Sequence, residues 1–233
     1  MGVAGFILAM TALVRRRASA SVVLVALLFS PVVHAADKAT DLEIRLGPTV
    51  LSDSDIQTVY GEKGFATFLI EAGRQWFNVV ELDAGFGLVR GKGDAVGQVG
   101  GEAVSSGYPA RLVMMPVSLS ATLRLEFLEN QAVVPFVRSG SEYWLWFEQV
   151  NEGNGYLQGG RGSGGMLGWH YGGGLNILLD VFSKERSGTM LARWGVQDSY
   201  LVIDWRNQSM LEDDPAGFGF GGSLLSVGLK LDK

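Results

Sequence analysis

Few side chains in this sequence could carry out chemistry. Beyond residue 35 the chain has one histidine, His170, and the whole chain has no cysteine. His170 could act as a general base, and the carboxylate pairs Glu81/Asp83 and Glu126/Glu142 could act as acid–base partners. With no thiolate and one imidazole, a metal site would have to be built from carboxylates and other oxygen ligands. We expect all of these groups to be structural, so we predict no catalytic residue, no bound metal and no cofactor.

Many charged residues occupy alternate positions along the chain. Between Val117 and Phe127 every odd-numbered residue is apolar and every even-numbered residue is polar or charged. This alternation indicates a β-strand whose two faces meet different surroundings. The strand has the roughly 9–11 residues needed to cross a bilayer at a tilt, against about 5–6 in most soluble proteins. A turn at Leu128–Ala132 and a second alternating run follow, so Arg111–Phe147 is predicted to be one long hairpin.

Similar alternation recurs along the chain. We predict eight strands, two of them in this hairpin and the others at Leu42–Leu46, Ala66–Arg74, Val79–Arg90, Met166–Phe182, Ser199–Arg206 and Ser223–Leu231. Long loops at one end and short turns at the other are typical of outer-membrane barrels. The sequence has this arrangement, with long connections at 48–65, 91–112, 148–165 and 207–222 and short ones at 75–78 and 128–132.

One connection, 183–198, departs from this arrangement because it is long where a short turn is expected. Met190, Leu191 and Trp194 in it have helical spacing, so we predict a short amphipathic helix over Ser183–Val196. The predicted fold class is therefore all-β: an eight-stranded antiparallel up-and-down transmembrane β-barrel with one short periplasmic-side helix.

Alternation by itself does not say which face of the barrel is wet. A soluble lipocalin-like barrel would place its apolar face inside. Here the charged face of the strands carries both acidic and basic residues, which could pair with one another in a narrow lumen filled by side chains. Aromatic residues fall mostly toward the predicted strand ends, as in the aromatic girdle of a membrane barrel. We therefore predict that the apolar face points outward. The predicted structural charge network of the lumen comprises Arg124, Glu126, Arg138, Glu142, Glu81, Asp83, Asp204 and Arg206, with ion pairs joining Arg124 and Arg138 to Glu126 and Glu142.

The first 35 residues have the features of a secretory signal peptide. Arg15–Arg17 form a basic segment, Val22–Phe29 an apolar segment, and Val33-His34-Ala35 a small-residue cleavage site. We predict a signal peptide at 1–35, with Met10 as an alternative start, and a single barrel domain at 36–233. The domain has 16 basic residues, once the three signal arginines are removed, against 24 acidic ones, a net charge of 16 − 24 = −8. Such a balance argues against nucleic-acid binding.

The mature chain resembles an uncharacterised family of small outer-membrane β-barrel proteins known mainly from Gram-negative predatory or soil bacteria. The resemblance rests on DLEIRLGP (Asp41–Pro48), VVPFVRSGSEYWLW (Val133–Trp146) and ERSGTMLARWGVQDSYLVIDW (Glu185–Trp205). It implies an outer-membrane location. It carries over no catalytic residue.

Three classes of function fit this fold. The first is a structural or surface-interaction role through extracellular loops, and the second is a narrow channel or a small-molecule-binding barrel, in a membrane or soluble in the periplasm. The third is a lipid-modifying enzyme. Barrel enzymes that deacylate lipid A place a serine two residues after a histidine, and Gly172 occupies that position here. We favour the first class. The expected partners are outer-membrane lipid and the barrel assembly machinery; the extracellular ligand is unknown, and the protein is expected to be a monomer.

Overall fold

The computed structural model describes residues 40–60, 64–76, 79–99, 102–128, 131–150, 161–180, 190, 192–211 and 219–233. The predicted signal peptide at 1–35 lies outside the described residues. In the described part of the chain, no helix is long and apolar enough to cross a membrane, a finding that says nothing of crossing by strands.

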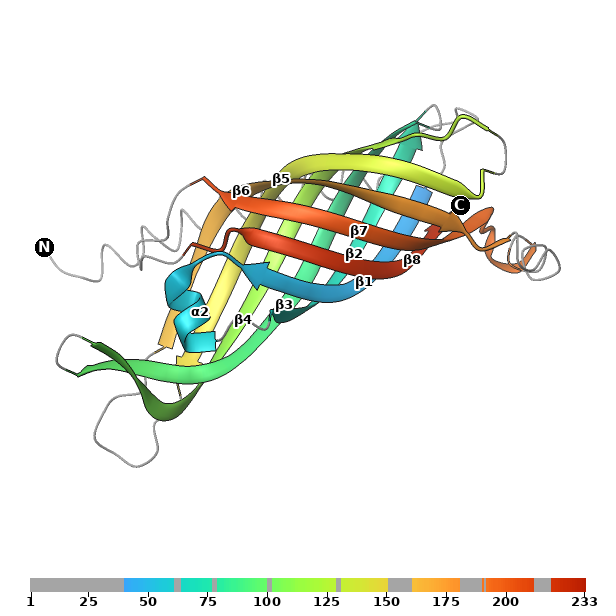
Figure 1. Ribbon diagram of the computed structural model, residues 1–233. Helices are drawn as coiled ribbons and strands as arrows, with labels where there is room; N and C mark the ends of the chain where they lie inside the picture. Colours follow the sequence, from blue (N-terminus) through green and yellow to red (C-terminus); the bar gives the residue numbers. More distant parts are fainter. Residues whose placement is uncertain are drawn as a thin grey trace, which may run out of the picture. The chain divides into compact units, whose positions relative to one another are not determined.

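Eight antiparallel strands form a closed barrel in which each strand pairs with its neighbours in sequence and the last strand pairs with the first (Figure 1). The predicted fold class is confirmed. The strands are β1 Thr40–Leu51, β2 Phe65–Trp76, β3 Val80–Val99, β4 Glu102–Arg124, β5 Val133–Val150, β6 Arg161–Leu178, β7 Asp198–Met210 and β8 Gly222–Asp232.

The register of the strands sets their tilt. Following paired residues from Thr40 of β1 through all eight strands leads to Ser223 of β8 and then back to Val50 of β1. The path returns 50 − 40 = 10 residues further along β1. A stagger of this size requires strands that are strongly tilted to the barrel axis. Side chains at one height of the lumen therefore come from positions shifted along successive strands.

The two faces of the barrel have the predicted chemistry. Apolar side chains of alternate residues are exposed on the outside, as at Leu46, Leu225 and Val227, whereas the intervening charged residues, such as Arg45 and Asp204, are buried in the lumen. An apolar outer surface and a polar interior are the features of a membrane barrel. The lipocalin-like alternative, which requires the opposite sense, is wrong.

The barrel has an inner end, where β1 begins and β8 ends, and an outer end opposite. The prediction that 91–112 is a loop is wrong, because β3 and β4 continue as a paired hairpin as far as Val99 and Glu102. The glycines that suggested a loop are tolerated there since the two strands satisfy each other's backbone hydrogen bonds. Most of the other strands are longer than predicted, because backbone pairing continues past the alternating residues. Two end earlier than predicted: β6 ends at Leu178 rather than Phe182, and β4 ends at Arg124 rather than Phe127.

A helix that the sequence did not predict lies in the first outer connection. Helix α2 spans Ser54–Tyr60, and the Asp53 side chain caps it by accepting a hydrogen bond from the Ile56 amide at 3.0 Å. Helix α2 lies beside the β3–β4 hairpin (Figure 1). A Cβ at Gly93 of β3 would lie 2.0 Å from the Val59 carbonyl oxygen, so only glycine allows this close approach.

Two further predictions concern the connection between β6 and β7 and the aromatic residues on these two strands. Residues Met190 and Ala192–Trp194 of the helix predicted at Ser183–Val196 are helical, and 183–189 and Leu191 lie outside the described residues. The prediction that outward aromatic residues lie mostly toward strand ends does not hold for Tyr171 and Trp205. Both lie in the interior of their strands, on the outer surface, with ring centroids 6.2 Å apart.

Candidate functional site in the barrel lumen

Midway along the barrel, six charged side chains from four strands fill the lumen. This central cluster contains three arginines and three carboxylates: Arg45, Arg138, Arg206, Glu43, Glu71 and Asp204. Glu43 and Glu71 are register partners on β1 and β2, and the tilt of the strands brings the other members to the same level. All six are at most 4% exposed. The charges are equal in number, so the cluster is neutral when every group is ionised.

Glu71 is the hub of the central cluster. One of its carboxylate oxygens accepts a hydrogen bond from Arg138 at 2.6 Å and another from Arg45, and its other oxygen accepts one from Arg206 at 2.8 Å. Asp204 also pairs with Arg45 and lies within 4.0 Å of the other two arginines. Each arginine is thus held by carboxylates from more than one strand. Such a network is rigid, because moving any one member leaves a buried charge without its partners.

A second group of charges lies at the inner end. This inner cluster contains Asp41, Glu81, Asp83, Arg124, Lys230 and Asp232. Arg124 Nη1 lies 2.7 Å from Asp232 Oδ2 and 3.7 Å from Glu81 Oε2, while its Nη2 lies 3.3 Å from the more exposed Glu126. Lys230 Nζ pairs with Glu81 and lies 3.5 Å from Asp41. Here four buried carboxylates face two basic groups, so the inner cluster has more negative than positive charge.

Glu142 does not pair with an arginine, contrary to the prediction. Its Oε2 lies 3.4 Å from Nδ1 of His170, and Nε2 of His170 lies 3.0 Å from the hydroxyl oxygen of Ser120. Serine, histidine and a carboxylate in this order are the components of a nucleophilic triad. The serine comes from β4, not from the position two residues after His170, which is Gly172. All three side chains are buried inside the lumen, where their contacts join β4, β5 and β6.

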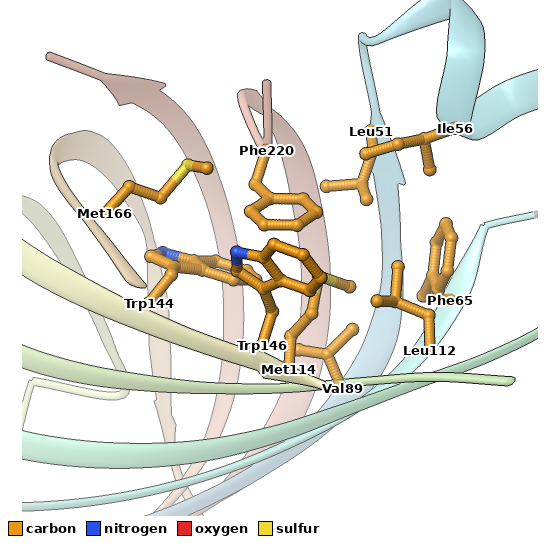
Figure 2. Close-up of a cluster of buried hydrophobic side chains, with 10 residues drawn as sticks. All are labelled: Leu51, Ile56, Phe65, Val89, Leu112, Met114, Trp144, Trp146, Met166 and Phe220. Atoms are coloured by element: carbon orange, nitrogen blue, oxygen red, sulfur yellow. The ribbon is translucent and has the colours of Figure 1, made fainter. Parts of the chain in front are cut away.

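The outer end of the lumen is apolar. Figure 2 shows Phe220, from the β7–β8 connection, beside the indoles of Trp144 and Trp146, with ring centroids 6.3 and 5.9 Å apart. Ile56 of α2 covers the same region from another side. The outer cluster consists of ten buried side chains: Leu51, Ile56, Phe65, Val89, Leu112, Met114, Trp144, Trp146, Met166 and Phe220. Lumens of membrane barrels are usually polar. In this barrel the apolar outer cluster lies between the buried charges and the outer end.

The eight residues of the predicted network therefore belong to three separate groups. Arg138, Asp204 and Arg206 lie in the central cluster. Glu81, Asp83, Arg124 and Glu126 lie at the inner end, and Glu142 lies with His170. The predicted network omitted six charged residues that pair with its members or with one another in the lumen. The first four of them lie on the charged face of their predicted strands and could have been included. The six are Glu43, Arg45, Glu71, Lys230, Asp41 and Asp232. The last two lie at strand ends that the sequence had placed outside the strands.

The chain was compared with known proteins. No protein-family description matches it, and no curated protein matches it. Among solved structures, it is similar to a major outer membrane protein from Thermus thermophilus, with a TM-score of 0.56 and 12% identity over 84% of this chain and 100% of that one. It is also similar to the outer membrane protein OprG from Pseudomonas aeruginosa, with a TM-score of 0.50 and 10% identity over 86% and 97% of the two chains.

Identities this low indicate a shared fold and nothing about a shared ligand. The closed eight-stranded barrel, the apolar outer surface, the charged lumen and the likeness to these two structures agree with one another. The chain has the fold of the small outer-membrane β-barrels.

Proposed function

We propose that this protein is a small outer-membrane β-barrel that acts through its outer end, in a structural or surface-interaction role, and that its lumen does not conduct. The observation that carries this proposal is the β3–β4 hairpin. β2 pairs with β3 as far as Arg90 and β5 pairs with β4 as far as Ala110, whereas β3 and β4 stay paired with each other to Val99 and Glu102, with one register shift between Asp94 and Val96. The hairpin therefore extends past its neighbouring strands as a two-stranded segment outside the barrel.

The packing of the lumen supports the second half of the proposal. The central cluster spans the lumen with three arginines held by shared carboxylates, and the outer cluster closes one end with aromatic and aliphatic side chains. An ion that passed through would have to separate buried ion pairs and cross an apolar layer, and each of these steps is costly. A narrow channel is therefore the weaker candidate.

The experiment tests location, conduction and surface function separately. Cells that express the protein are fractionated, and we expect it in the outer membrane, with folded and boiled forms that migrate differently on gels. Purified protein in planar bilayers should give no conductance steps. Attachment of the cells to immobilised matrix proteins and to other bacterial cells is then compared with that of cells in which residues 93–110 are replaced by an Asn-Gly turn.

The trimmed variant should keep the barrel and lose attachment. A matched control carries a short epitope in the inner connection, Leu128–Ala132, and should attach like wild type. The same epitope placed at residues 100–101 should bind antibody on intact cells, whereas the epitope in the inner connection should not. Regular conductance steps from wild-type protein, with attachment unaffected by trimming, would replace this proposal with the channel alternative.

A further inference from the structure

Three carboxylates of the inner cluster converge within the lumen. Asp41, Glu81 and Asp83 each contribute one carboxylate oxygen to a group of three oxygens that lie within 4.8 Å of one another. The residues come from β1 and β3, on either side of β2, and each is at least nine-tenths buried. Their convergence requires space on β2. Gly73 provides it, since a Cβ there would lie 2.1 Å from Asp83 Oδ1 and 2.7 Å from Asp41 Oδ2.

The partners of these carboxylates do not use all of their oxygens. Glu81 pairs with Lys230, and Asp83 accepts a hydrogen bond from Thr122 at 2.9 Å. Neither oxygen of Asp41 accepts a hydrogen bond, although Oδ1 lies 3.5 Å from Lys230 Nζ. Asp41 Oδ2 therefore points without a partner into the space above Gly73, where Asp83 Oδ1 also lies. A buried carboxylate oxygen with no donor is costly, and a cation or a shared proton at this position would offset that cost.

The charges of the site indicate the valence of that group. Three carboxylates against the single ammonium of Lys230 leave two negative charges among the residues that the structure describes at this site. Arg124 also lies 3.7 Å from Glu81, but it is closer to Asp232 at 2.7 Å and to Glu126 at 3.3 Å, and these two carboxylates already outnumber its single charge. The central cluster, by contrast, is balanced at three against three.

We propose that Asp41, Glu81 and Asp83 bind one hard divalent cation, of the Ca²⁺ type, above Gly73 at the inner end of the lumen. The ligands are all oxygens, which suits Ca²⁺ and disfavours metals that prefer nitrogen or sulfur. The bound cation joins β1 to β3 across β2, next to the seam where Asp41 of β1 faces Asp232 of β8. It therefore stabilises the closure of the barrel. This goes beyond the proposed surface function and does not depend on it.

The test uses the full mature protein, folded in detergent, treated with EDTA and then dialysed against CaCl2. Wild-type protein should retain one Ca²⁺ per chain by elemental analysis, and its unfolding temperature should rise when Ca²⁺ is restored. Asp83→Asn should retain no Ca²⁺ and should show no rise. Because this substitution relieves repulsion between carboxylates, Asp83→Asn should unfold at a higher temperature than wild type in EDTA.

Two further variants keep the proposal open to refutation. Glu126→Gln removes the same charge near the same end but none of the three ligands, so it should bind Ca²⁺ like wild type. Gly73→Ala keeps every charge and fills the space above β2, so it should lose Ca²⁺ while it remains folded by its heat-modifiable migration. If wild type retains no Ca²⁺ and is unaffected by EDTA, the carboxylates share a proton and the proposal is wrong. Equal retention by Asp83→Asn and Glu126→Gln would show adventitious binding, which also overturns it.

Discussion

The central cluster and the outer cluster both fill the lumen, but different forces hold them. In the centre, each guanidinium is placed by carboxylates from several strands, and Glu71 alone contacts three arginines. At the outer end, ten apolar side chains pack without any required direction. A charged cluster loses most of its stability when one member is removed, because its partners stay buried and unpaired. An apolar cluster loses stability in proportion to the volume removed, and it tolerates exchanges of similar size.

Removing a central arginine should therefore have the largest effect. Arg138→Ala leaves Glu43, Glu71 and Asp204 with one fewer positive charge in a buried setting. We expect a loss of about 3–5 kcal/mol in the free energy of unfolding, measured by urea titration in detergent micelles. Met114→Leu in the outer cluster serves as the control and should cost less than about 1.5 kcal/mol. Equal effects of the two substitutions would mean that the lumen centre is solvated.

The outer surface of the barrel offers the next largest effect and contrasts with the lumen, where charge is stabilising. Val227 is half-exposed at the middle of β8 and would contact acyl chains near the bilayer midplane. Val227→Lys should cost about 2–4 kcal/mol in lipid vesicles. Leu123 is similarly exposed but is the penultimate residue of β4, so Leu123→Lys should cost only about 0–1 kcal/mol. A larger cost for Leu123→Lys than for Val227→Lys would show that Leu123, and not Val227, lies nearer the bilayer midplane.

A small change in the outer cluster tests whether α2 is part of its packing. Ile56 is 1% exposed and connects α2 to the cluster in Figure 2. Ile56→Val removes one methylene, so the free energy of unfolding should fall by about 0.5–1.5 kcal/mol. Hydrogen exchange of the α2 amides should rise in the variant while that of β1 stays constant. Unchanged stability would indicate that α2 does not stay packed on the barrel.

The smallest effect is expected at a polar contact on the edge of the outer cluster. The Tyr60 hydroxyl donates a hydrogen bond to Glu148 Oε1 at 2.5 Å, and both groups are partly exposed. Tyr60→Phe should cost about 0.5–1 kcal/mol. Burial, together with the Glu148 carboxylate, raises the pKa of Tyr60 well above its ordinary value of 10.0.

The raised pKa gives this contact a pH dependence. The stability that the tyrosine contributes is fully present below pH 10.0 and falls as the pH rises from there toward the pKa of the folded state. The difference between wild type and Tyr60→Phe should therefore stay constant up to pH 10 and shrink above it, in urea titrations at each pH. A difference that grows above this pH would contradict the assignment of Tyr60 as the donor.

The sequence by itself determined the barrel. Alternation of apolar and charged residues is a local property of each strand, so it was sufficient to predict eight strands, their order and the outward apolar face. The connection lengths were also informative, except at 91–112, where pairing between β3 and β4 overrides the loop-like composition. Trp144 and Trp146 lie on the parity of Arg138 and Glu142, which places large apolar side chains in the lumen.

Only the tertiary structure decided which lumen residues meet. The stagger of ten residues around the barrel places Arg138 against Glu71 and Glu43, while Glu142, from the same strand, meets His170 instead. Two residues that a sequence pattern assigns to the same face of adjacent strands can still lie at different heights in a tilted barrel, and then they do not meet. Parity assigns a side chain to the inside or the outside, but the tilt and register of all eight strands together fix its height, and with it its partner.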